Sequence, residues 1–230
     1  MSILITNLNF YYNDTLILEN VNLSIKKGDL IIFFGPNGGG KTTLFKLILK
    51  LLKPTKGIIK TDNASIGYVP QKWFFDKDFP ITTYEFILLG SLYKTSFFEI
   101  FPKKIKSNVD FLLENLNLKN LKNKPLGSLS EGEIQKAQFA KALSSDPEIL
   151  ILDEPTSHMD PKSEKALFDQ IIKYKQKKTI LLTTHNLKTA SRLSDKLVLV
   201  DKQVIEKLPS EICEHFSLGL YHKPLIKKHE

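Results

Sequence analysis

A glycine-rich stretch at residues 35–43 constrains this chain more than any other part of its sequence. It fits the phosphate-binding pattern G-x-x-x-x-G-K-[S/T] without a mismatch. The apolar residues 30–34 before it predict a buried strand, and residues 44–52 after it predict a helix that ends before Pro54. A glycine-rich turn that matches by chance is disfavoured, because strand, loop and helix come in the required order. The stretch therefore predicts a nucleotide site.

The residue types in this stretch are those that polyphosphate binding requires. Glycines lack a Cβ, so backbone N–H groups can curl around phosphates at a helix N-terminus, whose dipole favours negative charge. Lys41 is expected to reach the β- and γ-phosphates of ATP, and the Thr42 hydroxyl to ligate Mg²⁺. We predict that ATP contacts the following residues: Gly35, Pro36, Asn37, Gly38, Gly39, Gly40, Lys41, Thr42 and Thr43.

Length and composition indicate a single globular domain. The chain has 230 residues, of which 42% are hydrophobic and 25% charged, enough to bury a sizeable core. Every uncharged apolar run is shorter than the roughly 18 residues of a membrane-spanning helix, and residues 1–6 show no export signal. The single cysteine, Cys213, excludes an internal disulfide and suits a reducing compartment. We expect a cytoplasmic protein.

The net charge of +8 comes almost entirely from lysine. It leaves two interpretations open: an acidic partner such as nucleic acid or a membrane surface, or a solvated lysine-rich surface. The second is favoured, because the lysines are spread along the whole chain rather than grouped with aromatic residues.

Hydrophobic periodicity divides the chain into three kinds of segment. Residues 4–25 alternate around a turn at 13–14 and predict antiparallel strands. Residues 73–124 are helix-like, with a break at Pro102, and predict an inserted helical subdomain. From residue 149 onward, apolar strands alternate with helical segments, which predicts a parallel sheet covered on both faces. The expected strands are 149–152, 179–183 and 196–200, and the expected helices are 163–175 and 187–194.

The predicted fold is therefore an α/β fold with a parallel-sheet core, an antiparallel β subdomain and an inserted α-helical subdomain. We assign residues 1–72 and 146–208 to the core and its β subdomain. Residues 73–145 form the expected helical subdomain, and 209–230 a C-terminal tail.

Several residues are expected at the carboxyl edge of the sheet, where ligands of such folds bind. Asp153 and Glu154 end the predicted strand 149–152; the first suits a Mg²⁺ site and the second a general base that activates water. His185 ends another strand and is expected near the γ-phosphate, and Gln71 is expected to sense Mg²⁺ or the attacking water. Acidic pairs in turns and histidines at strand ends are often structural, so these roles depend on the nearby glycine loop.

Residues 129–135 precede a predicted helix for which Ser130 is a natural N-cap, which makes a second anion site. One nucleotide does not need two helix N-termini from one chain. This redundancy suggests that the second site faces the ATP of a partner subunit.

The order of these motifs resembles the nucleotide-binding ATPase subunit of ABC transporters over essentially the full length, and the short spacing from Gly132 to Asp153 suits that family. The motifs are the aromatic Tyr12, the P-loop 35–43, Gln71 of the Q-loop, the signature 129–133, Asp153 and Glu154 of the Walker B strand, the D-loop 157–160 and His185 of the switch loop.

The resemblance implies a P-loop NTPase whose two copies sandwich two ATP molecules head to tail. Ser130 and Gly132 of one copy would then face the γ-phosphate held by Lys41 of the other, and Tyr12 would stack on the adenine. It also implies Glu154 as general base, His185 as transition-state support, and a Mg²⁺ site formed by Thr42, Gln71 and Asp153. Transmembrane permease subunits and a substrate-binding protein are the implied partners, with the ATPase peripheral on the inner membrane face.

The signature departs from the family's usual Leu-Ser-Gly-Gly-Gln at Glu131 and Glu133. Glu133 is a frequent variant. A Glu131 carboxylate about 6 Å from a phosphate would cost on the order of 2–3 kcal/mol at an effective dielectric constant near 20, and little if it points to solvent. We expect ATP-driven dimerisation to survive.

Residues 66–71, 78–82 and 88–90 are similar to those of importers for zinc, manganese or iron ions, so we expect import of a divalent metal, zinc or manganese. The tail histidines His215, His222 and His229 allow a regulatory metal site, although solvated side chains are favoured.

Two other functions stay open: a soluble ABC ATPase that acts on nucleic acid or the ribosome, and a non-hydrolysing ATP-dependent clamp. The single cassette argues against the first, and the intact catalytic set against the second, so we expect no direct nucleic-acid contact.

Overall fold

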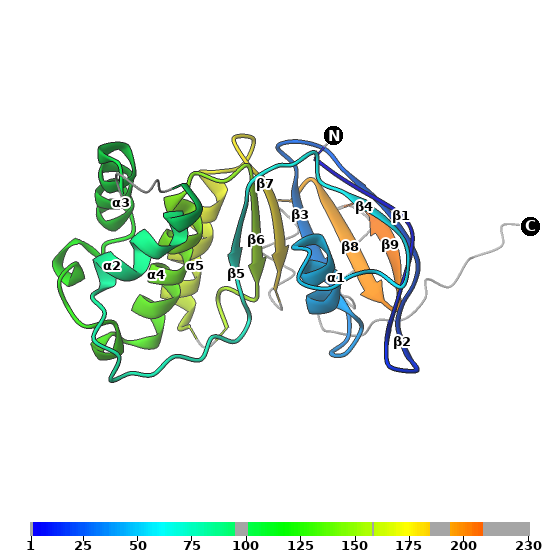
Figure 1. Ribbon diagram of the computed structural model, residues 1–230, viewed down its shortest axis with the longest axis horizontal. Helices are drawn as coiled ribbons and strands as arrows, with labels where there is room; N and C mark the ends of the chain where they lie inside the picture. The colour runs from blue at the N-terminus through cyan, green and yellow to red at the C-terminus, as the bar shows by residue number, and fades with distance from the viewer. Residues whose placement is uncertain (1, 95–100, 158, 185–193, 209–230) are drawn as a thin grey trace, which may run out of the picture.

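The computed structural model describes residues 2–94, 101–157, 159–184 and 194–208 (Figure 1). In this part of the chain, the larger sheet has six strands in the order β5-β6-β7-β3-β8-β9. All neighbouring strands are parallel except β8 and β9, which form an antiparallel pair. The strands are β3 (Leu30–Phe34), β5 (Ile66–Val69), β6 (Ile149–Asp153), β7 (Thr179–Thr183), β8 (Lys196–Asp201) and β9 (Gln203–Lys207).

The central strands are apolar because the sheet is covered on both faces. Every residue of β3, β6 and β7 is buried, as expected for parallel strands between two layers. Successive side chains of β3 enter opposite cores: Leu30, Ile32 and Phe34 join the core beneath the helices. Ile31 and Phe33 join the core that contains α1 (Lys41–Ile48) and the smaller sheet.

The smaller sheet is antiparallel and has the strand order β2-β1-β4 among the described residues. Its strands are β1 (Ile3–Tyr12), β2 (Thr15–Ile25) and β4 (Lys56–Lys60). Asn13, with a φ of 49°, forms part of the two-residue turn between β1 and β2, a position that favours Asn or Gly. This sheet lies at the side of the molecule that carries β8 and β9 (Figure 1).

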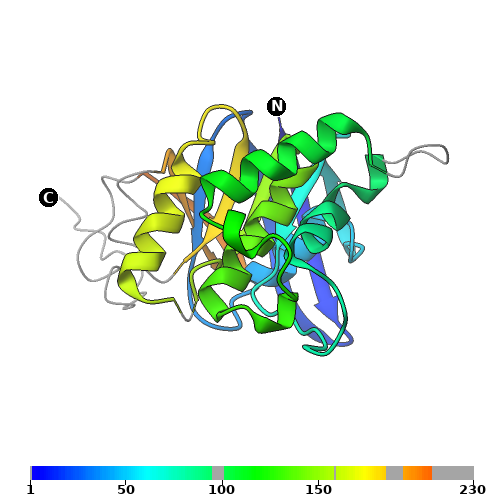
Figure 2. The ribbon, with the colours of Figure 1, turned by 90° about the vertical axis from the view of Figure 1, so that its left-hand side faces the viewer.

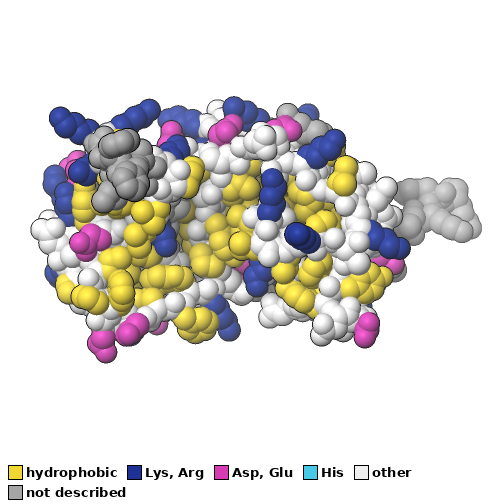
Figure 3. Space-filling view, viewed as in Figure 1, with side chains coloured by type: hydrophobic (Ala, Val, Ile, Leu, Met, Phe, Trp, Pro, Cys, Tyr) yellow, Lys and Arg dark blue, Asp and Glu magenta, His cyan; other side chains and the backbone are white. Residues whose placement is uncertain are grey.

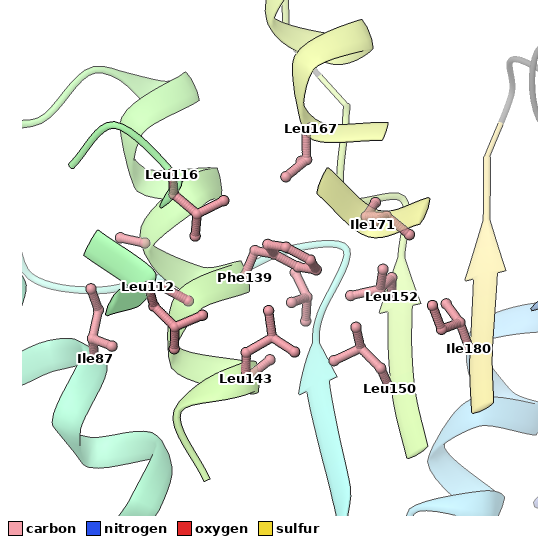
Figure 4. Close-up of a cluster of buried hydrophobic side chains, with 14 of the residues drawn as sticks. Ile87, Leu112, Leu116, Phe139, Leu143, Leu150, Leu152, Leu167, Ile171 and Ile180 are labelled. Atoms are coloured by element: carbon pink, nitrogen blue, oxygen red, sulfur yellow. The ribbon is translucent and has the colours of Figure 1, made fainter. Parts of the chain in front are cut away.

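Helices inserted between β5 and β6 form the opposite end of the molecule (Figure 2). The main ones are α2 (Thr83–Leu88), α3 (Lys103–Asn115) and α4 (Glu131–Ser144). They pack with α5 (Pro161–Ile172) on one face of the large sheet, and Phe139 of α4 points toward Ile171 of α5 and Leu152 of β6 (Figure 4). The short 3₁₀ helices are η1 (Leu89–Lys94), η2 (Lys119–Leu121) and η3 (Leu126–Ser128).

The predicted fold class is confirmed: an α/β fold with a parallel-sheet core, an antiparallel sheet and inserted helices. Strands 30–34 and 179–183 have the predicted bounds. The sequence interpretation missed β9, which is short and mostly exposed. The helix expected at 187–194 lies almost entirely outside the described residues, as do His185 and the tail 209–230. In the described part of the chain, no helix has the length and apolarity needed to cross a membrane.

Candidate nucleotide-binding site

At two positions of the glycine loop between β3 and α1, the surroundings leave no room for a Cβ. Gly35 has a φ of 138°, and a Cβ there would lie 2.2 Å from the carbonyl oxygen of Val200. A Cβ on Gly39 would lie 2.5 Å from the same oxygen. The loop therefore fits closely against the end of β8, and α1 begins directly after it at Lys41.

Lys41 lies over the glycine loop and is buried. Its ammonium donates hydrogen bonds of 2.9 Å each to the carbonyl oxygens of Gly35 and Pro36. Burial lowers the pKa of Lys41, while the charges of Glu154 and Asp153 oppose that shift. The positive charge is thus held at the mouth of the loop, where it can meet a polyphosphate.

Asp153, the last residue of β6, is held by hydroxyl groups on both carboxylate oxygens. Thr42 donates to Oδ2 at 2.7 Å, and Thr183 donates to Oδ1 at 2.7 Å. The side chain is 1% exposed. Burial raises the pKa of Asp153, and the hydrogen bonds from Thr183 and Thr42 act in the opposite direction. The arrangement fixes a carboxylate next to the first turn of α1.

Glu154 follows Asp153 with a φ of 50°, a left-handed backbone that residues with a Cβ seldom adopt. Its backbone N–H donates a 2.7 Å hydrogen bond to Oγ1 of Thr183. The residue is buried and lines the cavity described below. Thr183 was not among the predicted site residues. A polar residue at the end of the mostly apolar strand 179–183 is the sequence feature that could have indicated it.

A cavity of about 490 Å³ joins the predicted phosphate loop to Gln71 and Glu154. Its volume falls within the usual range for small-molecule sites. Ile17 of β2, which the sequence interpretation did not include, also contributes to its wall. The lining residues are Ile17, Asn37, Gly38, Gly40, Lys41, Thr42, Thr43, Gln71 and Glu154. Residues from four separate segments of the chain therefore converge on one site.

Other predicted site residues lie elsewhere in this chain. Tyr12 ends β1, is 44% exposed and packs edge-on against Phe10 at a ring distance of 4.9 Å, without lining the cavity. Ser130 and Gly132 lie at the start of α4 and do not line it either. Among the described residues, no group of three or more His, Cys, Asp or Glu side chains could hold a metal ion.

The start of α4 is closed by a capping box. Ser130 Oγ and its backbone N–H each donate to Oε2 of Glu133 at 2.8 Å, and Ser130 Oγ accepts from the backbone N–H of Glu133 at 3.4 Å. These hydrogen bonds from Ser130 lower the pKa of Glu133. Glu131 is exposed in the single chain.

The sequence profile of the ABC transporter family matches residues 18–157. The chain belongs to the ABC transporter family. It is 38% identical to a Chlamydia pneumoniae protein named "probable metal transport system ATP-binding protein", over 81% of this chain and 80% of that protein. It is 34% identical to the zinc import ATP-binding protein ZnuC of Wigglesworthia glossinidia brevipalpis, over 97% of this chain and 96% of that protein.

Solved structures support the same assignment. A bacterial ABC transporter cassette, solved as a dimer, superposes with a TM-score of 0.78 at 26% identity, over 90% of this chain and 98% of that one. The ABC ATPase described above therefore binds ATP and couples its hydrolysis to transport, as the motif order predicted.

Proposed function

We propose that this ABC ATPase binds Mg²⁺–ATP in the cavity beside the glycine loop and hydrolyses it to drive import of a divalent metal ion, zinc or manganese. The observation that carries this proposal is the convergence of Lys41, Thr42, Gln71 and Glu154 on one cavity. These residues supply a cation for the phosphates, a hydroxyl, an amide and a carboxylate, which are the groups that phosphoryl transfer to water requires.

The residues around Thr42 fit a magnesium ion. Mg²⁺ prefers oxygen ligands and retains several waters, and the Thr42 hydroxyl lies 2.7 Å from Oδ2 of Asp153. Thr42 would ligate the ion directly, with Asp153 acting through water and Gln71 at the cavity wall. The ion would supply positive charge that neutralises the phosphate oxygens.

Glu154 is the proposed general base. Its carboxylate accepts a proton from a water molecule, whose oxygen attacks the γ-phosphorus and releases ADP and phosphate. Lys41 holds the β- and γ-phosphates, and the backbone N–H groups of residues 35–43 surround them. His185 completes the proposed catalytic set, although it lies outside the described residues, and Tyr12 is the proposed adenine platform.

The ATP site is completed by a second copy of the chain. Supporting this, Ser130 is exposed at the N-terminus of α4, and neither Ser130 nor Gly132 lines the cavity of its own chain. A similar bacterial cassette has been solved as a dimer. In the proposed homodimer, Ser130 and Gly132 of one copy face the γ-phosphate bound to Lys41 of the other.

Hydrophobic side chains on the helical end of the molecule suit contact with a permease. They gather over η1, α2 and the loop that precedes α2 (Figure 3), and the exposed ones are Phe74, Phe79, Leu89, Leu92 and Tyr93. Exposed apolar patches of this kind mark protein interaction sites. We place the dimer against permease subunits on the inner membrane face, in a system that includes a substrate-binding protein.

The metal cargo is supported by the names of the relatives, which describe metal transport and zinc import. None of the described residues forms a metal cluster, and a transport motor needs none because the permease and binding protein contact the cargo. Nucleic acid has no comparable support, so the basic surface is attributed to solvated lysines.

The test is reconstitution of the ATPase with its permease in proteoliposomes, with phosphate release and uptake of zinc or manganese measured together. We expect both to proceed in the wild type. Glu154→Gln should lower phosphate release at least about 100-fold and stop uptake. ATP hydrolysis without movement of either ion would refute metal import. Stimulation by RNA in the absence of permease would favour the nucleic-acid alternative.

A further inference from the structure

Thr183, at the carboxyl end of β7, connects both acidic residues of the site through one hydroxyl group. Its side chain is fully buried. Oγ1 donates to Oδ1 of Asp153 and accepts from the backbone N–H of Glu154, both at 2.7 Å. The register of the sheet sets this geometry, because Thr183 and Asp153 are directly paired between β7 and β6.

The backbone of Glu154 benefits from such a constraint. Its φ of 50° lies in the left-handed region, which is unfavourable for a residue with a Cβ such as glutamate. The hydrogen bond to Thr183 restrains the amide group on the N-terminal side of this unusual conformation. The same conformation brings Glu154 to the wall of the cavity, together with Lys41 and Gln71.

Simple core filling does not account for this threonine. Valine has nearly the same shape and would fill the space without a polar group. A threonine that only filled the core could form its hydrogen bond with the nearby backbone of its own strand. Here the hydroxyl both donates and accepts a hydrogen bond at the end of the neighbouring strand, where Asp153 and Glu154 lie.

We propose that Thr183 is a positioning residue that holds the backbone of Glu154 so that its carboxylate meets the attacking water. The proposal rests on the role of Glu154 as general base. Thr183 does not line the cavity, so its loss should affect the hydrolytic step more than ATP binding. Because Thr183 also holds Asp153, this comparison requires saturating Mg²⁺.

The strand supplies a matched control. Thr179, at the other end of β7, is also fully buried, and its hydroxyl accepts from the backbone N–H of Gly28 at 3.1 Å and bonds to the Ser2 hydroxyl at 2.9 Å. Thr179→Val therefore removes a comparable pair of hydrogen bonds at the opposite end of the strand from the acidic residues. It should lower stability and leave the turnover number unchanged.

The test compares Thr183→Val, Thr183→Ser and Thr179→Val in the reconstituted complex at saturating Mg²⁺. Thr183→Val should lower the kcat of ATP hydrolysis about 10- to 100-fold while KM and the Kd for a fluorescent ATP analogue change less than about 2-fold. Thr183→Ser keeps the hydroxyl and should restore most of kcat. In the nucleotide-free ATPase, Thr183→Val should also speed hydrogen exchange at the Glu154 amide, followed by NMR.

Wild-type kcat in Thr183→Val would overturn the proposal. So would an equal fall in Thr179→Val, or a fall in Thr183→Val that Thr183→Ser does not rescue. The role of Glu154 is tested separately, because Glu154→Gln with wild-type hydrolysis would refute the general base. The amide exchange measurement still reports whether Thr183 holds that backbone.

Discussion

Thr42 donates a 2.7 Å hydrogen bond to Oδ2 of Asp153, a residue 111 positions further along the chain. This contact joins the first turn of α1 to the end of β6. The two oxygen groups that would surround Mg²⁺ are thus already adjacent in the protein alone. The proposed Mg²⁺ site would therefore need little rearrangement of these two groups.

Removal of the Thr42 hydroxyl should weaken the response to Mg²⁺ specifically. Thr42→Val should raise the Mg²⁺ concentration for half-maximal ATP hydrolysis about 10- to 100-fold, because the ion loses a ligand and Asp153 a partner. Binding of ATP in the presence of EDTA should change little. Thr42→Ser retains the hydroxyl and should behave like the wild type; equal Mg²⁺ dependence in all three proteins would contradict the assignment.

The two glycines Gly35 and Gly38 should differ sharply in their tolerance of a methyl group. A Cβ at Gly35 meets the Val200 carbonyl oxygen at 2.2 Å, whereas nothing lies within 4 Å of a Cβ at Gly38. Both have positive φ. Gly35→Ala should lower the free energy of unfolding by about 3 kcal/mol and Gly38→Ala by about 1 kcal/mol. Urea titrations measure both, and equal losses would show that the loop does not pack against β8.

Part of this architecture could be predicted from the sequence, and the reasons are physical. Strands 30–34 and 179–183 were predicted because a strand buried on both faces must be continuously apolar. The glycine loop was predicted because its backbone conformation restricts residue type. Strand β9 was missed since it is mostly exposed. The contact of Thr183 with Asp153 was not predictable, because it depends on the register between β7 and β6.

An ion pair away from the nucleotide site predicts how stability depends on pH. Lys178, 8% exposed, donates to the Asp146 carboxylate and to the Pro147 carbonyl oxygen. The hydrogen bond from Lys178, and then the charges of Lys178, Lys94 and Lys104, hold the pKa of Asp146 below its usual value. Because the folded-state pKa is lowered, the stabilisation is complete above the unfolded-state pKa and disappears as pH falls through the folded-state pKa.

Asp146→Asn should therefore lower the free energy of unfolding by about 1 kcal/mol at neutral pH, a modest value because the Asp146 side chain is largely exposed. The difference from the wild type should stay constant from pH 7 down to about 5 and shrink as pH falls below about 4. Asn also tolerates the left-handed backbone at this position, where φ is 50°. Asp110→Asn, which breaks the pair with Lys122, a lysine more exposed than Lys178, is the control. A deficit independent of pH would contradict the ion-pair explanation.

The central claim is that one ATP molecule is held by Lys41 of one copy and Ser130 of another. Two variants test the contributions of Lys41 and Ser130 separately, in a Glu154→Gln background that blocks hydrolysis. Lys41→Ala removes the phosphate cation. Ser130→Asp keeps a good N-cap for α4 but places a carboxylate against the γ-phosphate. A heterodimer of the two variants contains one intact ATP site, whereas neither homodimer contains any.

Sedimentation of each variant, and of their mixture, with saturating Mg²⁺–ATP tests this claim most directly. Glu154→Gln alone should dimerise despite the carboxylate of Glu131, each double variant should remain monomeric, and their mixture should form ATP-dependent dimers. A mixture that stays monomeric while Glu154→Gln dimerises would contradict the shared site. Dimerisation of the Ser130→Asp variant alone, as strong as that of Glu154→Gln, would contradict it equally.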